Sequence, residues 1–214
     1  GPGFDCLGLA LKLHNEVELD TEAPPGVSWE GEGAEELPTD GSDMVSAAIR
    51  WLAASHEMEV PEFHLHGVNR IPLERGLGSS SAAAVAGVML GDVLLDLGIG
   101  EDRRSIWSVA AEIEGHPDNA APCTYGGFTI ASPPSEGSPV RLDPHPGIHP
   151  VALIPKDVRL PTADARRALP SEVSLADAVF NLTRTAQAVV AFTQDPSLLA
   201  DALRDRLHQD VRLA

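Results

Sequence analysis

IPLERGLGSSSAAAV, residues 71–85, is the stretch from which the rest of the chain is best interpreted. Gly76 and Gly78 can adopt backbone angles that other residues avoid, and the three serines at 79–81 precede an alanine-rich apolar run. This order predicts a loop that leads into a helix. The first N–H groups of a helix lack partners and carry the positive end of its dipole, so a glycine-lined approach favours binding of a phosphate chain.

The loop is not a Walker A loop, because no GK[ST] follows the glycines and the chain has only two lysines, Lys12 and Lys156. Phosphate binding here would depend on backbone amides, serine hydroxyls and a metal ion. The alternative is a Gly/Ser-rich surface connection that happens to cap a helix with serine. Two further stretches bear on this choice, GPGFDCLGLAL at 1–11 and EGHPDNAAP at 114–122.

Composition and charge limit the classes of function. The chain has 214 residues, of which 43% are hydrophobic, which predicts a globular protein of one large or two small domains. Its formal net charge of −17 argues against nucleic acid and anionic membranes as partners. A nucleotide remains compatible, because charges beyond about 8 Å are largely screened and local groups decide.

Two cysteines, Cys6 and Cys123, lack CxxC spacing, so they indicate neither a zinc site nor a disulfide framework, and we expect a reducing cytoplasm. No apolar run reaches the ~20 residues of a membrane span, and no secretory signal pattern is present. The chain opens on Gly1, without methionine, inside what looks like a motif. We therefore expect sequence to be missing at both ends.

Hydrophobic periodicity predicts strands and helices along the chain. His64 and His66 alternate with apolar neighbours, which places both on the solvent face of a strand, with a metal-binding pair as the alternative. A Pro/Gly/Ser-rich stretch at 133–150 is the best candidate domain boundary. The expected strands are 17–20, 27–30, 63–67, 127–131 and a buried one at 151–154, and the expected helices are one capped by Ser42 that ends before Pro61, 79–97, 102–113, 175–193 and 198–207.

Taken together, GPGFDCLGLAL at 1–11, PLERGLGSSSAAA at 72–84 and EGHPDNAAPCTYGG at 114–127 resemble three segments of the GHMP small-molecule kinases, most closely the homoserine kinases. The resemblance covers most of the chain in order. It implies an α+β fold: an N-terminal ATP-binding domain of the ribosomal-protein-S5 domain 2 type at 1–132, a connection at 133–150, and an incomplete ferredoxin-like C-terminal domain at 151–214.

The resemblance also implies ATP-dependent phosphorylation of the side-chain hydroxyl of L-homoserine, a step towards threonine, with Mg²⁺ as the cofactor. Ser80, with Ser79 left open as the closer partner, would supply a hydroxyl near Mg²⁺, and Glu114 would supply a carboxylate. Without the resemblance, Glu114 would be a surface residue at a helix end. The ATP-binding loop would comprise Pro72, Leu73, Glu74, Arg75, Gly76, Leu77, Gly78, Ser79, Ser80 and Ser81.

A zwitterionic amino acid needs an anion for its ammonium group and a cation for its carboxylate. The resemblance assigns Asp5 to the first task, and Arg166, helped by Thr162 one helical turn away, to the second. Arg212 matches a second carboxylate-binding arginine, although Asp-Val at 210–211 replaces the Pro-Tyr that the family tends to have. By themselves, Thr162 and Arg166 would be a helix N-terminus and a surface charge.

His116 matches the histidine that lies beside the amino acid in the family. Asp118 and Asn119 follow it, and either can hydrogen-bond the attacking hydroxyl; the alternative is a turn in which one of them caps a helix. Related kinases use an aspartate as general base, whereas homoserine kinases are thought to manage without a dedicated one. A loose transition state lessens the need for early deprotonation, so no base is assigned.

Two segments of the family pattern are absent from the sequence: the N-terminal segment with an asparagine just before GPGFD, and a glycine-rich third motif near the C-terminus. The competing functions are a GHMP kinase for mevalonate or a sugar, and a non-catalytic nucleotide-binding module. Asp5, Thr162 and Arg166 argue against the first, because an alcohol without an amino-acid head needs no such charge pair. Family members are often homodimers, and these residues do not decide the oligomeric state.

Overall fold

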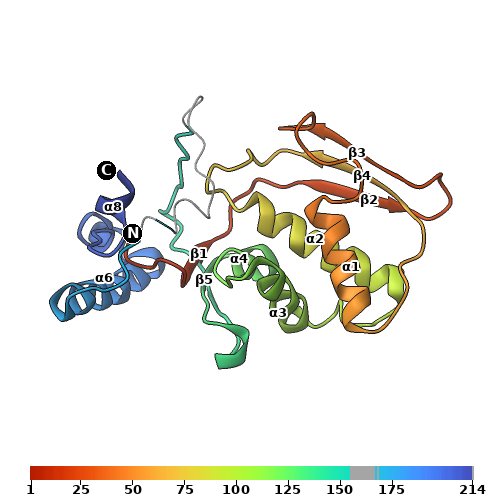
Figure 1. Ribbon diagram of the computed structural model, residues 1–214. Coiled ribbons are helices and arrows are strands. Elements are labelled where there is room, and N and C mark those ends of the chain that lie inside the picture. The colour runs from red at the N-terminus through yellow and green to blue at the C-terminus, as the bar shows by residue number, and fades with distance from the viewer. Residues whose placement is uncertain (155–166, 168, 214) are drawn as a thin grey trace.

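The computed structural model describes residues 1–154, 167 and 169–213. An α/β part lies at one end of the molecule and a helical part at the other, with β1 and β5 between them (Figure 1). In chain order, the helices and strands of the described residues are β1 (Leu7–Leu9), β2 (Glu16–Asp20), β3 (Gly26–Gly31), α1 (Met44–Ser55), β4 (His64–Asn69), α2 (Ser79–Leu95), α3 (Arg103–Glu114), α4 (Ala120–Tyr125), β5 (Phe128–Ile130), η1 (Pro134–Glu136), β6 (Val140–Leu142), α6 (Leu175–Thr193), η2 (Pro196–Leu198), α7 (Leu199–Ala202) and α8 (Gln209–Leu213).

Within the described ranges the strands form two three-stranded sheets. In the first, β4 lies between β2, which is antiparallel to it, and β3, which is parallel to it. In the second, β5 lies between β1 and β6 and is antiparallel to both. β6 falls inside the predicted connection at 133–150 and pairs with the strand before it. The division of the chain into domains at that stretch stays a prediction.

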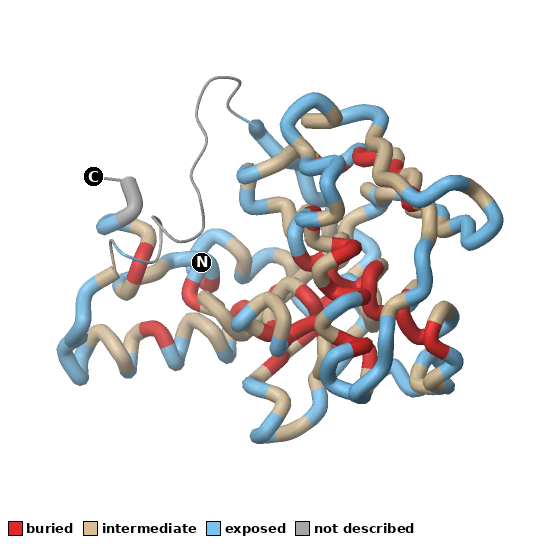
Figure 2. Tube along the Cα trace, turned by 45° about the vertical axis from the view of Figure 1, so that its right-hand side comes forward, coloured by how far each residue is buried: buried red, intermediate tan, exposed pale blue. Residues whose placement is uncertain are grey.

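The core lies where the first sheet packs on α1 and α2. Val45 and Ile49 from α1 meet Leu65 from β4, and all three are almost completely buried. A second cluster gathers around Trp107 of α3, whose indole N–H donates to the Pro117 carbonyl at 3.3 Å. Figure 2 shows most of the buried segments in this α/β part, with few along the helical part. The turn after α3 is therefore tied to the core.

Two helix ends differ from those predicted. α1 is capped by Asp43, whose Oδ1 accepts the N–H of Ser46 at 3.0 Å, so the predicted cap Ser42 was wrong by one residue. Ser42 instead donates to a carboxylate two residues before it. α2 ends at Leu95 rather than at 97, because Asp96 adopts a left-handed conformation with φ of 53°.

The C-terminal predictions at 151–154 and 198–207 were wrong. Residues 151–154 form no strand, and Leu153 is 91% exposed, because no strand of the described chain lies beside them to pair with. In place of the predicted helix at 198–207, η2 and α7 end at Ala202, and the Asp205 carboxylate accepts the N–H groups of His208 and Gln209 where α8 begins. None of the helices in the described part of the chain combines the length and apolar character needed to cross a membrane.

The histidines of β4 lie on the face opposite the core, as predicted, and both are partly buried. Ser28 of β3 lies within 3.3 Å of His64 Nε2 and within 3.0 Å of His66 Nδ1, while Leu65 between them points into the core. The alternative of a metal-binding pair gains no support, because the described residues contain no group of three or more His, Cys, Asp or Glu that could hold a metal ion.

Gly87 allows α1 and α2 to pack closely against each other, and a substitution there tests this contact. A Cβ at Gly87 would lie 2.5 Å from the Val45 carbonyl oxygen, whereas the nearest atoms to a Cβ at Gly91 would be Leu52 Cδ2 at 3.2 Å and Ile49 Cα at 3.4 Å. Gly87→Ala should destabilise the fold by about 1–3 kcal/mol despite the higher helix propensity of alanine. Gly91→Ala on the same helix is the control and should be close to neutral. Thermal unfolding of both variants measures the difference, and equal stabilities would contradict this packing.

Candidate active site

The loop at 72–78 ends in an uncapped helix N-terminus. Gly78 is the N-cap residue of α2, with φ of 74° and ψ of 27°, and α2 has no side-chain cap. The first backbone bond of the helix runs from the Ala82 N–H to the Gly78 carbonyl at 2.9 Å. The N–H groups at 79–81 precede that bond, so they lie at the positive end of the helix. This is the geometry that binds phosphate oxygens.

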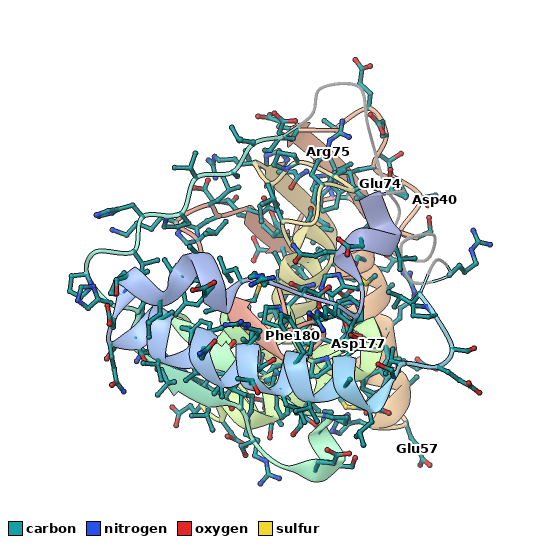
Figure 3. All side chains as sticks on the ribbon, turned by 90° about the vertical axis from the view of Figure 1, so that its left-hand side faces the viewer. Asp40, Glu57, Glu74, Arg75, Asp177 and Phe180 are labelled. Atoms are coloured by element: carbon teal, nitrogen blue, oxygen red, sulfur yellow. The ribbon has the colours of Figure 1, made fainter. Side chains whose placement is uncertain are left out.

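A cavity of about 570 Å³ lies at this helix end. Every residue of the predicted ATP-binding loop lines it except Leu73, whose side chain contacts Gly33. Arg75 is the one arginine or lysine among the described residues of its lining. Arg75 and Glu74 lie above α6 in Figure 3, well away from Asp177 and Phe180. The cavity, which we call the loop cavity, therefore combines a helix dipole with one guanidinium, both suited to an anion.

Glu114 bridges the end of α3 and the beginning of α2. Its Oε1 accepts the Ser80 hydroxyl at 2.6 Å and its Oε2 accepts the Ser81 hydroxyl at 2.5 Å. Gly115, with φ of 76°, turns the chain immediately afterwards. The structure thus brings together Ser80 and Glu114, the two predicted metal ligands, and adds Ser81, which the sequence marked only as part of the loop. Hard oxygen donors of this kind suit Mg²⁺.

His116 lies between two carboxylates. Its Nδ1 is 3.1 Å from Asp118 Oδ1, and its Nε2 is 4.0 Å from Glu114 Oε2. Asn119 is the N-cap residue of α4, yet its side chain makes no capping hydrogen bond. The side chain of Asn119 therefore does not cap α4, and the Asp118 carboxylate lies beside the imidazole of His116.

A second cavity, of about 470 Å³, lies on the other side of this turn, and we call it the acceptor cavity. Five predicted site residues, including Gly76 of the loop, share its wall with apolar side chains from β5 and α6. It meets the loop cavity at Gly76, His116 and Asn119, which line both. Its described lining includes Gly1, Pro2, Gly3, Phe4, Asp5, Leu7, His116, Asp118, Asn119, Phe128, Ala188, Phe192, Leu203 and His208.

Asp5 enters the acceptor cavity from a tight turn. The Gly3 carbonyl accepts the N–H groups of Cys6 at 3.2 Å and Leu7 at 2.9 Å, and Asp5 takes a left-handed φ of 58°. Burial raises the pKa of the Cys6 thiol, and the carboxylates of Asp118 and Asp5 raise it further. The cavity floor is therefore electronegative and the thiol stays protonated, which suits a cationic guest and not thiolate chemistry.

The remaining predicted substrate residues are not placed. Thr162 and Arg166 lie outside the described residues, and Arg212 lies in α8 without a described side chain. Sequence reasoning missed Phe192 and His208 as parts of the cavity wall. His208 lies four residues before Arg212, which the sequence analysis had already named as a possible substrate-binding residue. This closeness in sequence was the one signal that pointed to His208. Phe192 offers no such signal, because its role depends on how α6 docks.

Comparisons with known proteins identify the family of the chain. Residues 43–127 match the family model described as the GHMP kinases N terminal domain. The chain is 43% identical over 217 residues to a homoserine kinase of Clavibacter michiganensis, covering all of this chain and 68% of that protein. It is 43% identical over 221 residues to one of Corynebacterium aurimucosum, covering 99% of this chain and 71% of that protein.

A solved structure gives the same result for the fold. The crystal structure of homoserine kinase from Cytophaga hutchinsonii matches with a TM-score of 0.78 and 28% sequence identity, over 99% of this chain and 70% of that one. The predicted α+β architecture is confirmed by this match, and so is the resemblance first seen in three short motifs. By sequence and by fold, the chain belongs to the homoserine kinase family of the GHMP kinases.

Proposed function

We propose that this protein transfers the γ-phosphoryl group of ATP to the side-chain hydroxyl of L-homoserine. The observation that carries the proposal is that the loop cavity and the acceptor cavity meet at Gly76, His116 and Asn119. A polyphosphate in the first and an alcohol in the second would face each other across that junction. Phosphoryl transfer depends on such in-line positioning and on charge neutralisation more than on covalent help from the protein.

The triphosphate would be held by the N–H groups at the start of α2, the serine hydroxyls and Arg75. These groups act locally, so the net charge of −17 does not prevent a polyanion from binding. Gly76 has no heavy atom within 4 Å of an added Cβ, so the backbone there is open to a close approach. The absence of a loop lysine makes the helix end the main source of positive potential.

Mg²⁺ would be held by Glu114 together with Ser80 or Ser81. The fit rests on four oxygen atoms, two from the carboxylate and two from the hydroxyls, already gathered within hydrogen-bond distance and all of them hard donors. Since the described part of the chain contains no larger cluster of His, Cys, Asp or Glu, phosphate oxygens and water would complete the coordination. When bound, the ion neutralises the charge that develops on the transferred group.

Homoserine would lie in the acceptor cavity with its ammonium group on Asp5. Its carboxylate would be bound by Arg166 with Thr162, and by Arg212, on the strength of the family resemblance. Its hydroxyl would point to the turn at 116–119, where Asp118 Oδ1 lies 3.1 Å from His116 Nδ1. Whether Asp118 or Asn119 hydrogen-bonds the hydroxyl stays open, and no general base is assigned.

The oligomeric state and the cytoplasmic setting stay predictions. For the first, native mass spectrometry of the purified protein distinguishes a homodimer from a monomer. For the second, the two cysteines without CxxC spacing, both of which are free thiols in the structure, support a reducing compartment.

A coupled ADP-release assay separates the competing functions. The intact natural protein is supplied with Mg²⁺ and ATP, and with homoserine, mevalonate or galactose in parallel. We expect turnover with homoserine, since only that alcohol has the charged head that Asp5 and Arg166 would bind. Turnover with mevalonate or galactose alone would overturn the substrate assignment. Binding of ATP without any turnover would favour the non-catalytic module.

Glu114→Gln tests the metal site. The amide keeps the shape but loses the charge, so we expect kcat to fall at least about tenfold and the Mg²⁺ concentration for half-maximal activity to rise. Glu112→Gln is the matched control, because Glu112 lies two residues earlier in α3 and is exposed. Steady-state assays over a Mg²⁺ titration measure both. An unchanged Mg²⁺ dependence in Glu114→Gln would remove Glu114 from the metal site.

Arg166→Ala tests the carboxylate site. Losing a bidentate guanidinium should raise the KM for homoserine by at least about tenfold while leaving the KM for ATP nearly unchanged. The neighbouring Arg167→Ala, which the resemblance does not implicate, is the control. Initial rates with each substrate varied in turn give both constants. Equal losses for ATP and homoserine would mean that Arg166 has a structural role instead.

A further inference from the structure

The N-terminal loop that bears Asp5 is held by the far end of the chain. The Gly1 carbonyl accepts a hydrogen bond from His208 Nε2 at 2.8 Å, and the Pro2 carbonyl accepts one from the Thr185 hydroxyl at 3.0 Å. The His208 and Phe4 rings also contact each other, with centroids 4.7 Å apart. Both figures of the whole chain place the N-terminus beside the C-terminal helices (Figures 1 and 2). Two successive carbonyls of the loop are thus fixed by groups about 180 to 200 residues away in sequence.

His208 is itself held in place by two buried polar side chains. Asp205 Oδ2 accepts the backbone N–H groups of His208 at 2.8 Å and Gln209 at 2.7 Å, and its Oδ1 accepts the side-chain amide of Asn181 at 2.7 Å. Asn181 Oδ1 accepts the Arg206 N–H at 2.9 Å. The Asp205 side chain has no exposed surface. The segment at 205–209 is therefore attached to α6 through Asn181, and both oxygens of the Asp205 carboxylate accept hydrogen bonds.

The Asp205 side chain is an ionised carboxylate at neutral pH. Burial raises the pKa of this carboxyl, but the bonds from the Asn181 amide and from the backbone N–H groups of Gln209, His208 and Leu207 outweigh it and lower the pKa to about 2. The carboxylate can accept all of these hydrogen bonds at once. A neutral amide in its place would point its NH2 group at N–H donors, with which it cannot hydrogen-bond.

We propose that His208, supported by Asp205 and Asn181, is a positioning residue that holds the Asp5 loop in the form that binds the acceptor. This inference rests on the proposed function, because it concerns the same acceptor cavity. His208 is 7% exposed and lines that cavity, yet its Nε2 is committed to the Gly1 carbonyl. Since a carbonyl only accepts, Nε2 carries the proton.

The loop needs such support because its own geometry is unfavourable. Asp5 adopts φ of 58°, a region that costs a non-glycine residue energy and persists only where the surroundings impose it. Within the loop, the Gly3 carbonyl closes the turn on Cys6 and Leu7. His208 and Thr185 fix the two carbonyls just before it. Releasing them would let Asp5 leave the position that faces the ammonium group.

His208→Leu and Asp205→Asn in the intact natural protein test this role. Each is expected to raise the KM for homoserine by roughly tenfold, equivalent to about 1.4 kcal/mol, because a buried partner is left unsatisfied. The KM for ATP should change less than twofold, since the loop cavity does not contact these residues. His208→Gln keeps an N–H that reaches the Gly1 carbonyl and should restore most of the homoserine affinity.

Asp92→Asn is the matched control for destabilisation. Asp92 is also buried and also accepts two backbone N–H groups, of Ile99 at 2.8 Å and Gly100 at 2.9 Å, but it lies in α2 and lines neither cavity. It should lower the melting temperature to a similar degree and leave the KM for homoserine unchanged. An equal rise in KM in Asp92→Asn would show that general loosening is the cause and would overturn the positioning role.

Amide hydrogen exchange supplies a readout that does not depend on activity. Exchange at Cys6 and Leu7, whose N–H groups close the loop turn, should accelerate in His208→Leu and Asp205→Asn and not in Asp92→Asn. If the wild type fails to phosphorylate homoserine, the proposed function fails while this exchange pattern still tests the positioning. Unchanged loop exchange, or a His208→Gln variant as impaired as His208→Leu, would overturn the inference, the latter because it implies direct contact with substrate.

Discussion

The contact on which the site depends is the one between the Glu114 carboxylate and the two serine hydroxyls at the start of α2. It joins the C-terminal end of α3 to the N-terminal end of α2, so the negative charge lies at the positive end of a helix, where it is favourable. It also sets where the following turn begins. Because Gly115 reverses the chain directly after Glu114, His116 and Asn119 reach the wall shared by the two cavities.

The two cavities of the site have local charges of opposite sign. The loop cavity has a helix N-terminus and Arg75, whereas the acceptor cavity has Asp5 and Asp118 beside a thiol with a raised pKa. A polyanion and an ammonium group would therefore be sorted into different cavities even though the whole chain is strongly acidic. The turn between them, tied to Trp107 through the carbonyl of buried Pro117, separates the two environments.

The acceptor cavity is built from parts of the chain that are distant in sequence. Its wall combines the first residues, the turn after α3, Phe128 of β5 and Phe192 of α6, and those two rings stack at 5.0 Å. The loop cavity, by contrast, is made mostly from one contiguous loop and its helix. The loop cavity thus needs mainly local order, while the acceptor cavity exists only after the two ends of the chain have come together.

What could be predicted from sequence follows the same division. Local signals located α2 at its first residue, α3 and α6 within about one residue at each end, and the two strands that contain Ser28 and Leu65. Periodicity and capping chemistry act over a few residues, so a local pattern is enough for these elements. They failed at 151–154, where strand character needs a neighbouring strand, and at Ser42, where Asp43 competes for the same helix end.

The sequence by itself determined the glycine-containing loop that we propose binds phosphate, the serine-rich helix start and the family, because these are contiguous motifs whose geometry is set by neighbouring residues. Only the tertiary structure decided that Ser81 shares Glu114 with Ser80, and that the two cavities meet at His116. It also decided that His208 binds the loop of Asp5. The physical reason is that these contacts join segments tens to hundreds of residues apart, and their formation depends on how the helices dock, which no local pattern encodes.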